Sequence, residues 1–183
     1  MGNLAPVHSV HFYESHDSLI DRLCGVVCSG LLIGNSVLIV CTEEHRAQLI
    51  KALERLEIDV RNYAREGRFS ICDASELLAM FMVDGLPDAD LFMTSVGRLV
   101  IDAKKAARSK DQGLTVFGEM VAVLWEQGNK AGALALETLW NCAMQERVFH
   151  LHCAYPGWIF GGGDAELRDI CECHSHILGL TPA

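Results

Sequence analysis

The stretch Ser36-Val-Leu-Ile-Val-Cys41 is an uninterrupted apolar run, and Thr42-Glu-Glu follows it directly. A run of this kind lacks the alternation of a half-exposed strand and is typical of a strand buried on both faces of a parallel sheet. Thr42 predicts the start of a helix, because its hydroxyl can cap a helix whose first turn holds Glu43 and Glu44. A buried strand that leads at once into a helix predicts an α/β fold.

The same alternation recurs on both sides of this stretch. Further strands are predicted at 9–13, 69–72, 113–117 and 147–153. Helices are predicted from Ser15 or Asp17 up to Gly30, from 42 to 56, from Asp73 or Ser75 to 83, from 88 to 110, from 120 to 127, from 130 to 145 and from 164 to 178, with a polar link at 59–68. Strands separated by helices indicate a three-layer α/β/α fold with a mainly parallel central sheet.

The domain organisation follows from length and composition. The chain has 183 residues, which suits one domain. We expect the domain to occupy 1–160, with a C-terminal helix in 161–183 that belongs to it or extends it. The triple glycine at 161–163 is the predicted hinge between the two parts.

Charge and hydropathy exclude several classes of protein. Half of the residues are hydrophobic, which excludes a disordered chain, and the formal net charge of -9 argues against a nucleic-acid surface. No apolar run approaches the ~20 residues that cross a bilayer, and the first residues show no charged-then-apolar leader pattern. We therefore expect a cytoplasmic protein that contacts neither membranes nor nucleic acid directly.

The carboxyl ends of the predicted strands are where a ligand site is expected in a parallel sheet. The turn after the first strand reads Tyr13-Glu-Ser-His-Asp-Ser18 and contains neither Gly nor Lys. A phosphate loop needs both, so this turn predicts no ATPase of that type. The residues predicted to bind a ligand lie at these ends or on the helices behind them: Tyr13, Glu14, His16, Thr42, Phe117, Glu119, Trp125 and Tyr155.

Glu119 is the most informative of these residues, because it follows a buried strand and precedes an apolar helix. It can cap that helix, or its carboxylate can point into the crevice at the strand ends. In an enzyme, Glu14, Asp73 and Glu119 would be the candidate acids and bases. His152 and Cys153 are adjacent, but on a strand they face opposite sides and form no nucleophile pair. No recognised catalytic motif occurs, so the prediction leans away from an enzyme.

Eight cysteines and eight histidines are unusual for this length. Most cysteines lie in apolar segments, where free Cys packs as a small hydrophobe. The tail is denser, and its candidate metal ligands for zinc or copper are Cys171, Cys173, His174 and His176. On a helix, however, Cys171 and Cys173 would face different ways, which favours a tail without metal. His8, His11 and His16 have a spacing that suits no single compact site.

Several ordered motifs resemble a known family. The motifs are His11-Phe-Tyr13, Gly34-Asn-Ser-Val-Leu-Ile-Val40, Thr42-Glu-Glu-His45, Val116-Phe-Gly-Glu-Met-Val121, Leu136-Glu-Thr-Leu-Trp-Asn141 and Leu151-His-Cys-Ala-Tyr-Pro156. Together they resemble the MEDS domain, the methanogen/methylotroph sensory domain of dichloromethane-responsive regulators. The tail Cys171–His176 is similar to that of variants attached to histidine kinases. The resemblance implies a RecA-like fold, related to clock-type ATPases, that lacks the phosphate loop.

The resemblance also implies a bacterial sensory module for signal transduction, without turnover, that binds a small hydrocarbon-type ligand. Its partner would be a histidine kinase, a PAS domain or a transcriptional regulator. Such a module predicts a closed, partly apolar pocket lined by Tyr13, Phe117, Glu119, Trp125, Trp140 and Tyr155. An enzyme with converging carboxylates, a sensor that uses a metal or cofactor, and an interaction domain without ligand remain alternatives. The apolar face at 131–136 serves either a homodimer or the core.

Overall fold

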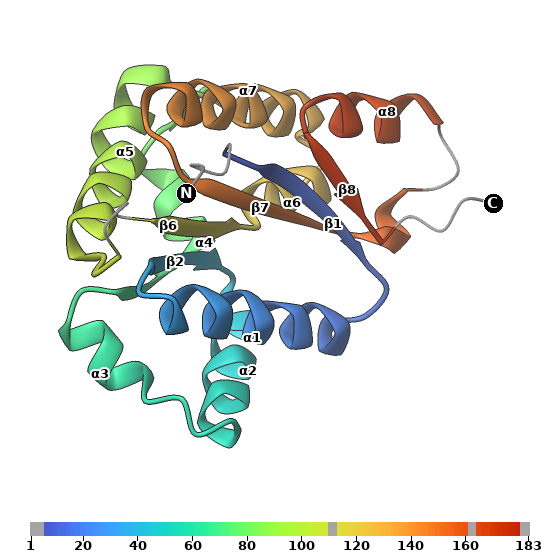
Figure 1. Ribbon diagram of the computed structural model, residues 1–183. Coiled ribbons are helices and arrows are strands. Elements are labelled where there is room, and N and C mark those ends of the chain that lie inside the picture. Colours follow the sequence, from blue (N-terminus) through green and yellow to red (C-terminus); the bar gives the residue numbers. More distant parts are fainter. Residues whose placement is uncertain (1–5, 110–112, 161–163, 180–183) are drawn as a thin grey trace.

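A parallel sheet is the centre of the computed structural model, which describes residues 6–109, 113–160 and 164–179. Within these ranges six parallel strands lie in the order β3-β2-β6-β7-β1-β8 (Figure 1). Their bounds are β1 His8–Tyr13, β2 Ser36–Cys41, β3 Phe69–Asp73, β6 Leu114–Gly118, β7 His150–Pro156 and β8 His176–Leu178. The five predicted strands are all present, and the three-layer α/β/α architecture is confirmed.

Helices cover both faces of the sheet (Figure 1). On one face α1 (His16–Leu32), α2 (Glu43–Arg55) and α3 (Val60–Arg65) enclose one hydrophobic core. On the other face α4 (Ala74–Ala79), α5 (Ala89–Ala106), α6 (Met120–Glu126), α7 (Lys130–Glu146) and α8 (Asp164–Glu172) enclose a second and larger core. None of the described helices is long and apolar enough to cross a membrane.

Side-chain caps fix where several of these helices begin. Ser15 forms a capping box with Ser18 at the start of α1, which decides between the two predicted start residues. The Thr42 hydroxyl accepts a hydrogen bond from the His45 backbone N–H and caps α2, as predicted. Asp73 caps α4 in the same way. These caps place the start of each helix directly beside the end of the preceding strand.

The connections create two places where neighbouring strands lead to opposite faces. β2 pairs with β6, but α2 follows β2 on one face while α6 follows β6 on the other. β1 pairs with β7, and α1 follows β1 on the first face while α8 packs on the second. Ligands of open α/β sheets bind in crevices at such divergence points. The fold therefore offers two positions for a site, both at the carboxyl ends of the strands.

Three local predictions were wrong. The helix predicted to reach residue 83 ends at Ala79, and Met82–Val83 (β4) pairs with Leu86–Pro87 (β5) in a hairpin. The link at 59–68 contains α3. The last helix ends at Glu172, and the residues that follow form β8, which pairs with β1. An edge strand needs a neighbour distant in sequence, and local periodicity does not show that neighbour. The hinge predicted at 161–163 lies outside the described residues.

Candidate functional site

Glu119 connects the carboxyl ends of β6 and β2. It stands at the first position before α6, yet its side chain makes no cap hydrogen bond to that helix. Instead Oε1 accepts a hydrogen bond from the Thr42 backbone N–H at 2.6 Å. The side chain of Glu119 is buried. Of the two roles open in the sequence, the structure shows a carboxylate that points into the crevice at the first divergence point.

His45 is the main side-chain partner of this carboxylate. Its Nδ1 lies 2.8 Å from Oε2 and 3.1 Å from Oε1 of Glu119, so the ring donates to the acid. Burial alone would lower the pKa of His45, but the hydrogen bond and the negative charge of Glu119 outweigh it and raise the pKa above its usual value. The buried His45 ring therefore binds its proton more tightly in the folded protein than in the unfolded chain.

His16 extends the pair to the surface. Its Nδ1 lies 2.6 Å from Nε2 of His45, and His16 itself is exposed at the start of α1. A proton on either nitrogen makes this contact a hydrogen bond. The three residues thus form a continuous hydrogen-bonded chain from the buried carboxylate of Glu119 to solvent. We call Glu119, His45 and His16 the proton chain.

Aromatic rings surround the outer part of the proton chain. Trp158, on the short 3₁₀ helix η1 (Gly157–Ile159), contacts Tyr13 edge-on at 5.3 Å between ring centroids and His16 at 5.5 Å. Tyr13 also lies edge-on to His45. Burial and the negative charge of Glu119 raise the pKa of Tyr13, so its hydroxyl stays protonated. Trp158 is 53% exposed and separates the proton chain from a neighbouring pocket.

That pocket lies at the second divergence point, between the end of β1 and α8. Its volume is about 470 Å³, within the range of small-molecule sites. Among the residues that the structure describes, four of the lining side chains are large and apolar, and Glu14 contributes the one carboxylate. The lining residues are Phe12, Glu14, Gly157, Trp158, Phe160, Leu167 and Gly179. We call it the aromatic pocket.

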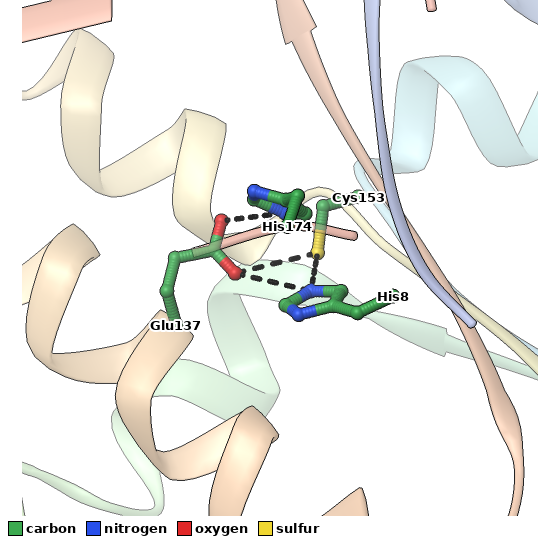
Figure 2. Close-up of side chains that lie close together, drawn as sticks. All are labelled: His8, Glu137, Cys153 and His174. Carbon is green, nitrogen blue, oxygen red and sulfur yellow. Dashed lines mark hydrogen bonds and ion pairs between the residues drawn. The ribbon is translucent and has the colours of Figure 1, made fainter. Parts of the chain in front are cut away.

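A second group of polar side chains lies on the other face of the sheet, buried beneath α7 (Figure 2). His8 comes from β1, Glu137 from α7, Cys153 from β7, and His174 from the segment between α8 and β8. The ligand atoms of these four residues lie within 4.8 Å of one another. We call them the buried tetrad. Glu137 is completely buried, and Tyr155 donates a hydrogen bond to its Oε1 at 2.9 Å.

Comparison with known proteins gives this geometry a family. Residues 7–175 match the sequence model of MEDS, described as the MEthanogen/methylotroph, DcmR Sensory domain. The chain belongs to the MEDS family. The match spans most of the chain and includes the proton chain and the buried tetrad, so the role of this domain is sensory. No curated protein matches the chain significantly.

In this MEDS domain the predicted binding residues separate into distinct groups. Tyr13, His16, Thr42 and Glu119 meet around the proton chain, as their strand-end positions suggested. Glu14 is exposed and lines the aromatic pocket. The remaining aromatic residues pack in the cores instead. These are Phe117 on the α1 face, and Trp125, Trp140 and Tyr155 on the α7 face.

This separation also changes the expected pocket of the MEDS domain. Tyr13 and Phe117 lie on one face of the sheet, whereas Trp125, Trp140 and Tyr155 lie on the other. Side chains on opposite faces of a continuous sheet cannot line one closed cavity. The aromatic pocket is lined by other residues, chiefly Phe12, Trp158, Phe160 and Leu167.

The tail residues of the MEDS domain do not gather into one group. His174 turns inward, and its side chain is completely buried beside Glu137. Cys173 donates from Sγ to the Asp169 carbonyl, and His176 is exposed on β8. Cys171 is half-buried at the edge of the larger core. Only His174 of the four predicted metal ligands therefore joins the buried tetrad.

The sequence reasoning missed several residues that the structure places at these sites, among them His45, Trp158 and Glu137, and it assigned neither His8 nor Cys153 to a site. His45 had a usable signal, because it lies in the first turn of a helix that begins directly at a strand end. Glu137 had another, since an acid in the apolar face of a helix must be paired where it is buried. Trp158 follows the strand end by only two residues.

Proposed function

We propose that this sensory domain binds a small, largely apolar molecule in the aromatic pocket and transmits its occupancy to a signalling partner. One observation carries the proposal: a pocket of about 470 Å³ at a strand-end divergence point is lined by four large apolar side chains. Three of them are aromatic rings, which bury a large area against an apolar ligand. Among the described lining residues Glu14 is the one carboxylate, and its charge favours a neutral or weakly cationic ligand over an anion.

The walls of the pocket suggest how occupancy reaches a partner. Leu167 belongs to α8, and Gly179 follows β8, so a ligand contacts the last helix and the end of the edge strand. Trp158 contacts the ligand on one side and His16 of the proton chain on the other. A shift of Trp158 on binding changes the surroundings of the exposed end of that chain. The partner we propose is a histidine kinase, a PAS domain or a transcriptional regulator of bacterial type.

Ligand-observed NMR with four small probes tests the binding step. Toluene and dichloromethane represent apolar ligands, and methanol and formate are the polar and anionic counterparts. We expect saturable binding of the apolar probes only. Leu167→Trp adds an indole to the aromatic pocket and is expected to raise the Kd at least tenfold.

Met80→Trp is the matched control, because Met80 lines a different pocket of about 370 Å³ beside α4. This variant is expected to bind as the wild type does. If Met80→Trp loses binding and Leu167→Trp retains it, the ligand binds in the pocket beside α4, and the proposal is wrong. Absence of saturable binding by either apolar probe would also overturn the proposal.

The proton chain favours a second candidate, a proton-transfer enzyme. Its exposed end, His16, is positioned to act as a general base, with His45 and Glu119 behind it. This candidate predicts that the protein hydrolyses an activated ester such as p-nitrophenyl acetate. The hydrolysis rate should fall at least tenfold in His16→Gln. Equal rates for the wild type and His16→Gln would exclude it.

A further inference from the structure

The buried tetrad contains the four donor groups of a transition-metal site, and no role in the proposed ligand binding requires them. Two imidazoles, one carboxylate and one thiol approach one another from four separate segments of the chain (Figure 2). Charged or polar side chains are rarely buried unless each is paired or binds a metal. The question is which of these two explanations fits the donor atoms.

Four distances between donor atoms lie close to the edge length of a small tetrahedron, and all four ligand atoms lie within 4.8 Å of one another. His8 Nε2 lies 3.3 Å from Glu137 Oε2 and 3.4 Å from Cys153 Sγ, and Cys153 Sγ lies 3.6 Å from Glu137 Oε2. His174 Nε2 lies 3.5 Å from Glu137 Oε1. Zinc bonds of about 2.0–2.3 Å in tetrahedral geometry separate the ligand atoms by about 3.3–3.8 Å. His8, Glu137 and Cys153 already have these separations, and His174 Nε2 lies within 4.8 Å of each of the other ligand atoms.

Hydrogen bonds outside the tetrad fix the ring orientation and the tautomer of His8 and His174. Asn141 donates from Nδ2 to the Cys173 carbonyl, so its Oδ1 faces His8 and accepts from Nδ1–H at 2.9 Å. His174 donates from Nδ1 to the Ile170 carbonyl at 2.7 Å. In both neutral rings the remaining lone pair is then on Nε2, the nitrogen that points into the tetrad. This outer support is characteristic of histidines that bind a metal.

His174 supplies an independent observation. Its side chain is completely buried, and its Nε2 has no hydrogen-bond partner although it lies 3.5 Å from the Glu137 carboxylate. Two lone pairs directed at a carboxylate repel it, whereas a divalent cation stabilises the imidazoles, the carboxylate and the sulfur at once. Tyr155 meanwhile holds the carboxylate in place through its hydroxyl.

We propose that the buried tetrad binds one Zn²⁺ ion through His8 Nε2, His174 Nε2, Cys153 Sγ and the Glu137 carboxylate. Mixed nitrogen and sulfur ligands favour zinc over magnesium or calcium, which prefer oxygen. On binding, the Cys153 thiol loses its proton to solvent and the sulfur forms the bond to zinc as thiolate. Four protein ligands close the coordination shell, so this ion holds structure and does not activate water. The site links β1, α7 and β7 to the segment between α8 and β8.

Cobalt substitution of the wild-type protein gives the most direct test. The full chain is treated with EDTA, freed of the chelator and titrated with Co²⁺. We expect one ion per chain, strong visible d–d bands from tetrahedral coordination and a thiolate-to-cobalt charge-transfer band in the near ultraviolet. Zn²⁺ should then displace Co²⁺ and abolish both signals. Weak bands without a thiolate transition, or no binding at all, would overturn the proposal.

Matched variants identify the ligands. Cys153→Ser should lose the charge-transfer band, and His174→Gln should weaken Zn²⁺ binding at least tenfold in competition with a chromophoric chelator. Cys173→Ser and His176→Gln change the same residue types in the tail outside the tetrad, and both should bind as the wild type does. If these two variants lose the metal and the tetrad variants keep it, the site is in the tail and the assignment is wrong.

Folding and independence are checked separately. Circular dichroism confirms that each variant is folded, and the wild-type cobalt spectrum stands even if one variant is not. The toluene titration described above uses a different pocket. Failure of the apolar probes to bind therefore leaves the zinc result unchanged, and the reverse holds equally.

Discussion

The carboxylate of Glu119 accepts a hydrogen bond from Nδ1 of His45 at 2.8 Å, although the two residues are 74 positions apart in the sequence. Both side chains are buried. The contact joins the end of β6 to the first turn of α2, so it crosses the divergence point between β2 and β6. The same carboxylate holds the Thr42 N–H, which makes it the polar centre of this edge of the sheet.

Removal of this carboxylate should destabilise the domain. Glu119→Ala leaves the Thr42 N–H and the His45 ring without their acceptor in a buried position. We expect the free energy of unfolding to fall by about 3 kcal/mol, the scale of a broken buried pair with a charged hydrogen bond. Urea denaturation measures this change.

Glu14→Ala is the control for this substitution. Glu14 is the same residue type at the end of β1, which β7 separates from β6, but it is exposed. Its replacement should change the free energy of unfolding by no more than about 0.5 kcal/mol. Equal effects of the two substitutions would contradict a special role for the Glu119–His45 contact.

Stability should depend on pH through His45. In the unfolded chain its pKa is near 6.5, whereas in the folded chain Glu119 raises the pKa above that value against the effect of burial. The folded state thus binds the proton more tightly, and the resulting stabilisation is fully present below about pH 6.5. It is lost as the pH rises through the folded pKa.

Comparison with His45→Gln isolates this effect, because glutamine can still donate to Glu119 but does not titrate. The difference in free energy of unfolding between the wild type and His45→Gln should shrink as the pH rises above about 6.5. Denaturation curves at a series of pH values measure it. A difference that grows with pH would show that the folded pKa is lowered, which is the opposite sign.

Two glycines in α1 should respond in opposite directions to the same substitution. A Cβ at Gly25 meets no atom within 4 Å, so Gly25→Ala should stabilise the helix by about 0.5–1 kcal/mol. A Cβ at Gly30 would lie 2.8 Å from Cγ2 of Val37, a buried residue of β2. Gly30→Ala should therefore be destabilising by about 1 kcal/mol despite its better helix propensity. Thermal unfolding of both variants checks this, and two stabilised proteins would show that α1 does not pack as described.

The end of β8 provides a further matched pair. Gly179 and Gly85 share a positive φ of 83°, but a Cβ at Gly179 would meet the backbone oxygen of Phe12, whereas at Gly85 the space is open. Gly85→Ala should lose only about 1–2 kcal/mol from the left-handed conformation. Gly179→Ala should in addition detach β8 from β1.

Amide hydrogen exchange distinguishes these two results. In Gly179→Ala, exchange should accelerate at the amides of β8 and of its partner residues Ser9, Val10 and His11. In Gly85→Ala those amides should keep their wild-type protection. Unchanged protection in both variants would mean that the turn at Gly179 does not hold the edge strand.

Much of the fold could be predicted because its information is local. The buried run at Ser36–Cys41 and the caps at Thr42 and Asp73 give strand and helix boundaries from a few neighbouring residues. β8 could not be found in this way, because three residues at a sheet edge become a strand only through pairing with β1. The strands of the β4–β5 hairpin are equally short, and the helical pattern of the residues before it led to the prediction of a helix up to residue 83.

The candidate sites divide along the same line. Tyr13, His16, Thr42 and Glu119 were predictable because the ends of parallel strands meet at one edge. The buried tetrad could not be predicted, because its members come from β1, α7, β7 and the segment after α8. Their spacing in the sequence does not indicate that they lie close together in the fold. The dense tail predicted metal ligands at Cys171, Cys173, His174 and His176, whereas the structure brings only His174 into the buried tetrad.

The place of β1 in the sheet bears on how the protein is made. β1 pairs with β7 and β8, and His8 exchanges hydrogen bonds with Ser175, 167 positions later. At typical ribosomal speeds, β1 has left the ribosome on the order of 10 seconds before its neighbours are synthesised. During that interval β2, β3 and β6 can already pair with one another. β1 still lacks both strands that it pairs with, and its apolar side chains remain exposed. Nascent-chain binding by chaperones should therefore concentrate on β1 and end when β7 emerges.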